Sequence, residues 1–232
     1  MKSKCDWGFS LVELLVVISI IGLLSGLALP VISSARMSGS KAVSAGNLRN
    51  LGLAISSYVA DNDGYLPGAT SCLTAVSPFA KGSSQNSLQV KLITYLEKEF
   101  KPSGANWTFY TKCLAYPAWV MFNKGTNDNS SPPYILCQDY PATAGAVFSP
   151  FGGGTGGGNE LKMTQAQEVM RSLTNKPYAV IETDQQLYQK LTWNDPSWKK
   201  NLSQNPEHGK VRNVLYFDGH VEAVAINKPL PW

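Results

Sequence analysis

An apolar run near the start of the chain constrains its fold more than any other feature. Residues 9–32 read FSLVELLVVISIIGLLSGLALPVI, and these 24 residues carry one charge, on Glu13. As a helix the run would be about 36 Å long, which is enough to cross a hydrocarbon core of roughly 30 Å. The run therefore predicts a membrane-spanning helix, with the rest of the chain folded outside the bilayer.

Two lysines, Lys2 and Lys4, precede the apolar run. By the positive-inside tendency they place the N-terminus in the cytoplasm and the rest of the chain beyond the inner membrane. One alternative is a secretory signal peptide cleaved after Ala28, and another is an uncleaved plain anchor. The first is disfavoured because signal cores usually have about 7 to 15 apolar residues and seldom carry a carboxylate near their start.

The residues around the start of the run form a recognisable pattern. A short basic leader ends in Gly8, the sequence FSLVE follows at 9–13, and the apolar helix begins there. This pattern resembles the prepilin cleavage and methylation segment of type IV pilins and type II secretion pseudopilins, and Pro30 falls where that family commonly has a kinking proline. The resemblance implies that a prepilin peptidase cuts between Gly8 and Phe9, methylates the new amine of Phe9 and leaves the anchor in place.

Glu13 gives this resemblance a mechanism. A carboxylate inside a membrane span costs roughly 2.5 to 3.5 kcal/mol, so it usually has a partner or a path to water. Pairing with the new amine of Phe9 on the same or a neighbouring subunit would relieve both charges and set the axial register of a filament. The alternative is that Glu13 only reaches the headgroups of the bilayer.

Two glycines in the span indicate close helix packing. Gly22 and Gly26 form a Gly-x-x-x-Gly pair, which lets helices approach closely. The signal is weak alone, because small residues are frequent in membrane helices. We expect both glycines, with Glu13 and Pro30, to act in assembly.

Beyond Pro30 a helical period continues to residue 60 and predicts a helix that leaves the bilayer and lies on a sheet. Gly39, Gly46 and Gly52 each weaken this helix, so local unwinding is expected. Turn-forming residues 61–64 end it, and no glutamate follows at the spacing of a calcium loop. The expected apolar face consists of Val43, Leu48, Leu51, Ile55, Tyr58 and Val59, and the expected polar face of Lys41, Ser44, Arg49, Ser56 and Ser57.

The C-terminal third predicts an antiparallel sheet. Residues 178–184, 211–217 and 220–226 have strand patterns, and Asp218-Gly219 predicts a hairpin at 211–226 with a type I′ turn. Short helices are expected at 88–100 and 164–173. The expected fold is therefore α+β and pilin-like, with a long N-terminal helix on a C-terminal antiparallel β-sheet. Its parts are a cleaved leader 1–8, a membrane half 9–32, a soluble helical half 33–60 and a head 61–232.

A second motif lies near the other end of the chain. His208 is followed, after nine intervening residues, by Asp218-Gly219. This spacing resembles a tail motif that accompanies the prepilin leader in a large pseudopilin-like group of environmental bacteria. We expect a structural role, in which Asp218 accepts hydrogen bonds from backbone amides and His208 fastens the loop before the hairpin. A metal site with His208, Asp218 or His220 stays open, but two histidines give no strong ligand spacing.

Charge and cysteine content narrow the function. The net charge of +4 comes from 20 basic and 16 acidic residues without a basic run, so no nucleic-acid partner is expected. No metal or cofactor is expected either. Removal of the leader would leave three cysteines, and their pairing stays open. They are Cys72, Cys113 and Cys137.

The expected function is that of a filament subunit in the inner membrane, with a prepilin peptidase and other pilin-like subunits as partners. The alternative is an anchored module that binds a polysaccharide or secreted cargo through its tryptophans. An enzyme is not expected, because no nucleophile or metalloprotease motif occurs. Glu182 and Asp184 would share one face of a strand, but strand ends commonly carry such residues without chemistry. The tryptophans are Trp107, Trp119, Trp193, Trp198 and Trp232.

Overall fold

A computed structural model gives the fold, and the chain divides into two compact units, Met1–Gly39 and Ser40–Trp232. We call the second unit the head. The expected leader and the Gly8–Phe9 junction lie outside the described residues. These are 10–68, 75–76, 79–81, 88–97, 108–110, 114–123, 132–136, 140–141, 147–148, 150–152, 160–172, 178–188 and 202–228.

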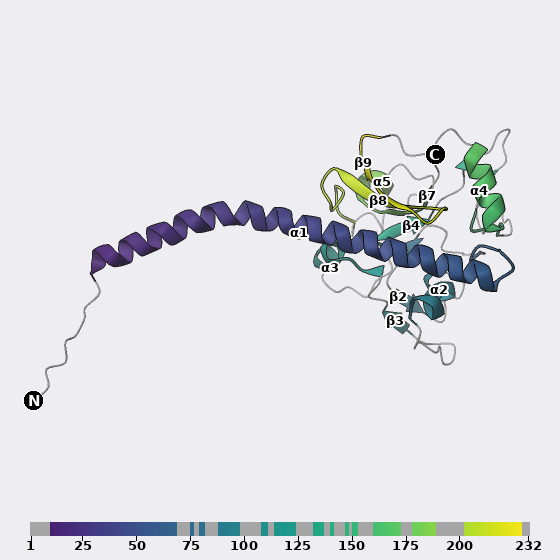
Figure 1. The fold of residues 1–232 in the computed structure, drawn as a ribbon, viewed down its shortest axis with the longest axis horizontal. Coiled ribbons are helices and arrows are strands. Elements are labelled where there is room, and N and C mark those ends of the chain that lie inside the picture. The colour runs from purple at the N-terminus through teal and green to yellow at the C-terminus, as the bar shows by residue number, and fades with distance from the viewer. Residues whose placement is uncertain are drawn as a thin grey trace, which may run out of the picture. The chain divides into compact units, whose positions relative to one another are not determined.

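The first element is a single long helix, α1, from Leu11 to Asp61 (Figure 1). The unwinding expected at the glycines is wrong, because the helix is continuous through all three of them. Gly52 shows a reason: a Cβ there would lie 3.0 Å from a methyl carbon of Leu215, so glycine allows close packing against the sheet. Such packing offsets the low helix propensity of glycine.

An antiparallel sheet of five strands forms the centre of the head, in the order β1-β4-β7-β8-β9. The long helix and this sheet confirm an α+β layout, and the strands expected in the C-terminal third are confirmed with slightly shorter bounds. The strands are β1 (Ala75–Val76), β4 (Tyr134–Leu136), β7 (Tyr178–Glu182), β8 (Val211–Tyr216) and β9 (Val221–Ala225).

Smaller elements surround this sheet. The helices expected at 88–100 and 164–173 are confirmed as α2 (Leu88–Leu96) and α4 (Met163–Ser172). Two further helices are α3 (Pro117–Asn123) and α5 (Gln185–Tyr188). Two ribbons of two strands pair β2 (Phe79–Lys81) with β3 (Thr108–Tyr110), and β5 (Tyr140–Pro141) with β6 (Val147–Phe148).

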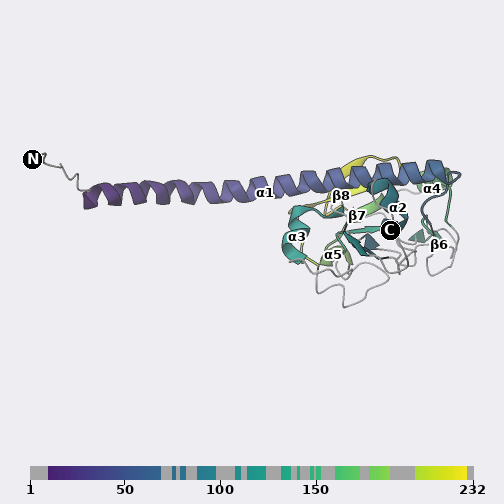
Figure 2. The ribbon, with the colours of Figure 1, turned by 90° about the horizontal axis from the view of Figure 1, so that it is seen from below.

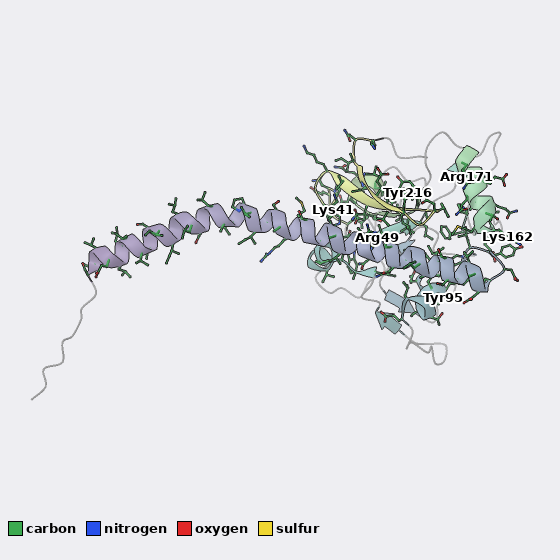
Figure 3. All side chains as sticks on the ribbon, in the orientation of Figure 1. Lys41, Arg49, Tyr95, Lys162, Arg171 and Tyr216 are labelled. Carbon is green, nitrogen blue, oxygen red and sulfur yellow. The ribbon has the colours of Figure 1, made fainter. Side chains whose placement is uncertain are left out.

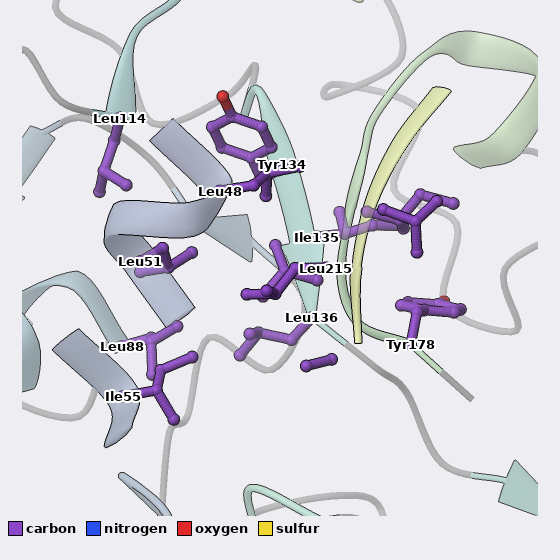
Figure 4. Close-up of a cluster of buried hydrophobic side chains, with 14 of the residues drawn as sticks. Leu48, Leu51, Ile55, Leu88, Leu114, Tyr134, Ile135, Leu136, Tyr178 and Leu215 are labelled. Atoms are coloured by element: carbon purple, nitrogen blue, oxygen red, sulfur yellow. The ribbon is translucent and has the colours of Figure 1, made fainter. Parts of the chain in front are cut away.

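The core of the head lies between the second half of α1 and the sheet (Figures 2 and 4). Leu48, Leu51 and Ile55 are buried there, as the helical period predicts. Two expectations about which residues of α1 face the core and which face the surface are wrong. Val43 is exposed, and Ser44 is fully buried because its hydroxyl contacts Glu182 on the sheet.

The expected turn at the end of α1 is confirmed. The N–H of Gly64 donates to the carbonyl of Val59 at 2.9 Å, and Asp63 and Gly64 have φ of 51° and 84°. Left-handed residues with such a bond are a common helix ending. Residues 61–64 therefore act as a helix stop.

The hairpin between β8 and β9 is confirmed, but its expected type I′ turn is wrong. The loop has three residues, Phe217–Gly219, and only Gly219 has positive φ, at 87°. Gly219 N donates to Tyr216 O at 3.0 Å, and Tyr216 N donates to His220 O at 3.0 Å. This matches a type I turn followed by a left-handed glycine. The longer loop lets Phe217 enter the core, where its ring centroid lies 5.7 Å from that of Phe151.

Candidate functional site

The first candidate site is the apolar half of α1. All residues from Leu11 to Ile32 are exposed, and the large apolar side chains among them have exposed fractions from 45% to 84%. This is the one helix in the described part of the chain that is long and apolar enough to cross a membrane, with a mean hydropathy of 2.6 in its most apolar window. A helix satisfies its own backbone polar groups, which a bilayer requires.

Gly22, Gly26 and Pro30 lie within this apolar half. A Cβ added at either glycine would meet nothing within 4 Å in the described structure. Pro30 has no N–H to offer the carbonyl of Gly26, four residues earlier in the helix. The glycines thus leave an open strip on the helix surface, without a local packing reason for their small size.

Glu13 has a role that the sequence analysis missed. The N–H of Ser10 donates to Glu13 Oε2 at 2.9 Å, and the N–H of Val12 donates to Ser10 Oγ at 3.3 Å. Both residues together cap the first turn of α1, as in a capping box. The signal was present in the sequence, as a serine followed three residues later by a glutamate before an apolar run. Glu13 Oε1 has no partner among the residues that the structure describes, so the cap leaves one carboxylate oxygen available.

The second candidate site is a buried polar cluster under α1. We define the clasp as five buried residues from α1, β4, β7, β8 and the segment before β8. Their exposed fractions do not exceed 5%, so any charge among them is held away from bulk water. The members of the clasp are Ser44, Tyr134, Glu182, His208 and Asn213.

Glu182 is the centre of the clasp. Asn213 donates to it twice, from its backbone N to Oε2 at 2.6 Å and from Nδ2 to Oε1 at 2.9 Å. His208 Nε2 lies 3.0 Å from Oε1, and the hydroxyl of Ser44 also donates to that oxygen. Asn213 Nδ2 donates in addition to the carbonyl of Lys41 at 3.0 Å. One carboxylate therefore joins the helix, the sheet and the segment before β8.

A second buried pair lies beside the clasp. Arg212 donates to Asp184 through Nε and through Nη2, the latter at 3.0 Å from Oδ1. The N–H of Leu187 donates to the same Oδ1 at 2.9 Å, so Asp184 also caps α5. Protein donors thus engage the carboxylates of both Asp184 and Glu182, which favours a structural interpretation of these two residues.

Glu207 is the most strongly perturbed acid of this region. Burial raises the pKa of Glu207 to about 7, although the Tyr116 hydroxyl and His208 favour its ionised form. The ring of Tyr116 also lies against His208, with 5.3 Å between the ring centroids. The segment that carries His208 into the clasp therefore favours the protonated form of Glu207 more than water does.

The C-terminal motif divides between the interior and the surface. His208 fastens the segment before the hairpin, as expected, through Glu182. Asp218 Oδ1 accepts the N–H of His220 at 3.2 Å and also pairs with its ring Nδ1. Partial burial raises the pKa of Asp218, but these contacts with His220 outweigh it and lower that pKa below its usual value.

The structure does not bring His208 together with the two exposed residues of the motif. Strand β8 separates the buried His208 from Asp218 and His220 at the hairpin turn. No group of three or more His, Cys, Asp or Glu side chains that could hold a metal ion occurs among the described residues. The motif therefore forms two separate fastening points in the described structure.

Of the five tryptophans considered as a ligand platform, only Trp119 is described, and it is buried in the core. Trp107, Trp193, Trp198 and Trp232 lie outside the described residues, as do Cys72, Cys113 and Cys137. Two features of the described structure bear on function. They are the exposed apolar half of α1 and the clasp beneath its other half. No protein-family model, curated protein or solved structure matches this chain.

Proposed function

We propose that this chain is a structural subunit of a type IV pilus-like or type II secretion pseudopilus filament. A prepilin peptidase would process it after Gly8, and its N-terminal helix would carry assembly. The observation that carries the proposal is the exposure of every side chain from Leu11 to Ile32 on a helix that continues into the head. So large an apolar surface needs lipid or other helices to cover it.

Details of the same segment favour a filament over a plain anchor. Glu13 keeps Oε1 free, and it lies four positions after the residue whose amine cleavage would create, Phe9. A buried charge pair between subunits would relieve both charges. Gly22 and Gly26 are open and would let neighbouring helices approach closely. A plain anchor needs none of these features.

The proposed location follows from the charges before the helix. Lys2 and Lys4 favour a cytoplasmic N-terminus, so the head would lie in the periplasm or on a surface filament. Partners in this proposal are the inner membrane, the prepilin peptidase and other pilin-like subunits. A module that binds polysaccharide or secreted cargo is less well supported, because the described Trp119 is buried in the core.

Mass spectrometry of the mature N-terminus tests the proposal. The full chain would be expressed with and without a prepilin peptidase, and the expected product starts at N-methylated Phe9 only when the peptidase is present. A Gly8→Leu variant is the matched control and should stay uncut. A mature chain that starts at Leu29, or a wild-type chain that stays uncut beside an active peptidase, would contradict the proposal.

A further inference from the structure

The end of the head where α1 enters it has a distinctive surface. Ser40 is the first residue of the head, and its Oγ accepts the N–H of Ala118 at 3.1 Å, which places α3 at this end. Pro117 on the same helix is exposed, and so is Val120, with an exposed fraction of 44%. Apolar side chains from α3 are thus presented next to the entry point of α1.

Three lysines gather at the same end. Lys41 follows Ser40 directly, and its carbonyl accepts Asn213 Nδ2 of β8 at 3.0 Å. Lys210 precedes β8, and its carbonyl accepts the N–H of Ile226 at 3.0 Å just after β9 ends. Lys228 lies two residues further along and donates its backbone N–H to Ala225 at 3.1 Å. Lys41, near the start of the part of α1 that belongs to the head, and the open end of the β8–β9 hairpin thus share one side of the head (Figure 3).

We name this surface the entry rim and define it as Lys41, Pro117, Val120, Lys210 and Lys228. Lys210 and Lys228 are exposed, and Lys41 is half-buried. Among the described residues, none of these lysines forms an ion pair with a carboxylate. Glu207 precedes Lys210 by three residues, but it is part-buried against Tyr116. Glu182 and Asp184 are buried in their own hydrogen bonds, and Glu222 lies further along β9 towards the hairpin turn.

We propose that the entry rim contacts the anionic lipid headgroups of the leaflet from which α1 emerges. Positive charge beside exposed apolar side chains is the composition that binds an anionic interface. The contact rests on the part of the proposed function in which residues 9–32 span the membrane. It would hold the head against the bilayer before the subunit leaves for the filament.

The length of α1 brings the rim within reach of the headgroups. Lys41 lies nine positions after Ile32 in α1, which is about 13.5 Å of helix. The headgroup layer occupies roughly 5 to 8 Å of that distance on each side of the hydrocarbon core. The remaining gap of about 5.5 to 8.5 Å is comparable to the Debye length of about 8 Å at physiological salt, so the lysine charges still act on the lipid.

The test uses the full chain in lipid nanodiscs and measures hydrogen exchange of peptides that cover 205–213 and 225–228. One set of discs contains phosphatidylcholine alone and the other adds phosphatidylglycerol. Each basic residue near an anionic surface changes binding about fivefold. We therefore expect several-fold slower exchange with phosphatidylglycerol, and loss of this difference at high salt.

A charge-reversal pair gives the variant and its control. Lys210→Glu with Lys228→Glu should abolish the slower exchange. Lys162→Glu with Arg171→Glu changes the net charge equally but should preserve it. Lys162 directly precedes α4 and Arg171 lies within it. The first residue of α4, Met163, donates its N–H to the carbonyl of Gly64, just after α1 ends. That end of α1 is about 30 Å of helix away from Lys41.

Three results would overturn the contact. The first is equal exchange in both kinds of disc, and the second is an equal loss in the control pair. The third is the same slowing when inorganic phosphate is added to phosphatidylcholine discs, since the rim would then bind a free anion rather than the lipid. A chain that never inserts into the discs is a separate outcome. It removes the membrane span on which both this contact and the proposed function depend.

Discussion

Glu182 is an acid in the interior of the head whose neighbours are all hydrogen-bond donors. The backbone and side-chain nitrogens of Asn213 can only donate, so the clasp requires Glu182 as an acceptor. His208 Nε2 and the Ser44 hydroxyl complete its surroundings. A buried carboxylate of this kind adds little net stability compared with an apolar side chain in the same place. Its removal alone, however, leaves buried hydrogen-bond donors without their acceptor.

Truncation of Glu182 should therefore be among the most destabilising changes in the head. Glu182→Ala leaves the backbone N–H of Asn213 and the ring Nε2 of His208 buried without their partner, and we expect a loss of about 3 to 5 kcal/mol. Urea unfolding of the detergent-solubilised chain measures this loss. Glu222→Ala is the matched control, because Glu222 is exposed on β9 and should change stability by less than about 0.5 kcal/mol. Similar losses for both variants would refute the clasp as described.

Glu207 gives the head a predicted pH dependence. Its folded-state pKa of about 7 lies above the reference value of 4.5, so the folded state holds the proton more tightly. Below pH 4.5 the ionisation of Glu207 contributes nothing to the free energy of unfolding. Between pH 4.5 and about 7 it destabilises the folded state increasingly, and above pH 7 this destabilisation levels off. The full interval corresponds to about 3 kcal/mol.

Glu207→Gln isolates this contribution, because glutamine resembles the protonated acid at every pH. Wild type should be less stable than the variant by up to about 3 kcal/mol at pH 8, and the difference should shrink towards zero near pH 4.5. Urea unfolding of both chains across this pH range measures it. A difference that does not vary with pH would mean that Glu207 is not held in a buried environment.

Glu13 combines a local role with a proposed assembly role, and two substitutions separate them. Glu13→Gln keeps an acceptor for Ser10 N–H but removes the charge, whereas Glu13→Ala removes both. If pairing with the amine of Phe9 drives assembly, both variants should insert normally yet incorporate into filaments at least tenfold less than wild type. Quantitative immunoblotting of sheared filaments against total membrane protein measures this. Normal incorporation of Glu13→Gln would assign Glu13 to capping alone.

At the scale of elements, periodicity predicted those whose pattern is long. The helix, the hairpin and two short helices were predicted because each repeats a spacing over several residues. The face of α1 was partly wrong at Val43 and Ser44, since a serine reads as a surface residue unless its buried partner is known. Glu182 lies 138 residues after Ser44, and no local pattern connects them.

The hairpin turn and the short strands also could not be predicted fully from local sequence patterns. Asp218-Gly219 was predicted as a two-residue turn, but burial of Phe217 favours a longer loop, and that burial depends on Phe151 elsewhere in the chain. Strands β1 and β4 have two and three residues, which is too short for an alternating pattern to be recognised. In the candidate sites, His208 was predicted to fasten a segment, but its partner depended on the tertiary fold.

The glycines of α1 permit a matched test of helix packing. Gly46 has open space where a Cβ would lie, whereas a Cβ at Gly52 would come within 3.0 Å of Leu215. Gly46→Ala should therefore stabilise the head by about 0.5 to 1 kcal/mol. Gly52→Ala should gain less or lose stability, since Leu215 must move. Thermal unfolding of both variants measures the contrast, and equal gains would show that α1 does not pack closely on the sheet at Gly52.

At the scale of the whole molecule, the two units make different demands on their surroundings. The apolar half of α1 has no buried residue before Ser40, whereas the head contains a continuous core that includes Leu48, Leu51 and Ile55. The second half of α1 is thus held by the head, and the first half exposes its apolar side chains. Among the described residues, the core of the head begins at Leu48 of α1 and contains no residue of the apolar half.

A chain that starts at Arg36 should therefore be a folded, soluble monomer. It keeps Ser40 and every clasp residue, and it removes the exposed apolar side chains from Leu11 to Ile32. We expect cooperative unfolding within about 1 kcal/mol of the full chain in detergent, because every described residue that is removed is exposed. Size-exclusion chromatography and urea unfolding measure both properties, and the Glu182→Ala change in this shortened chain should cost as much as in the full one. An aggregated or unfolded product would show instead that the apolar half of α1 contributes to the stability of the head.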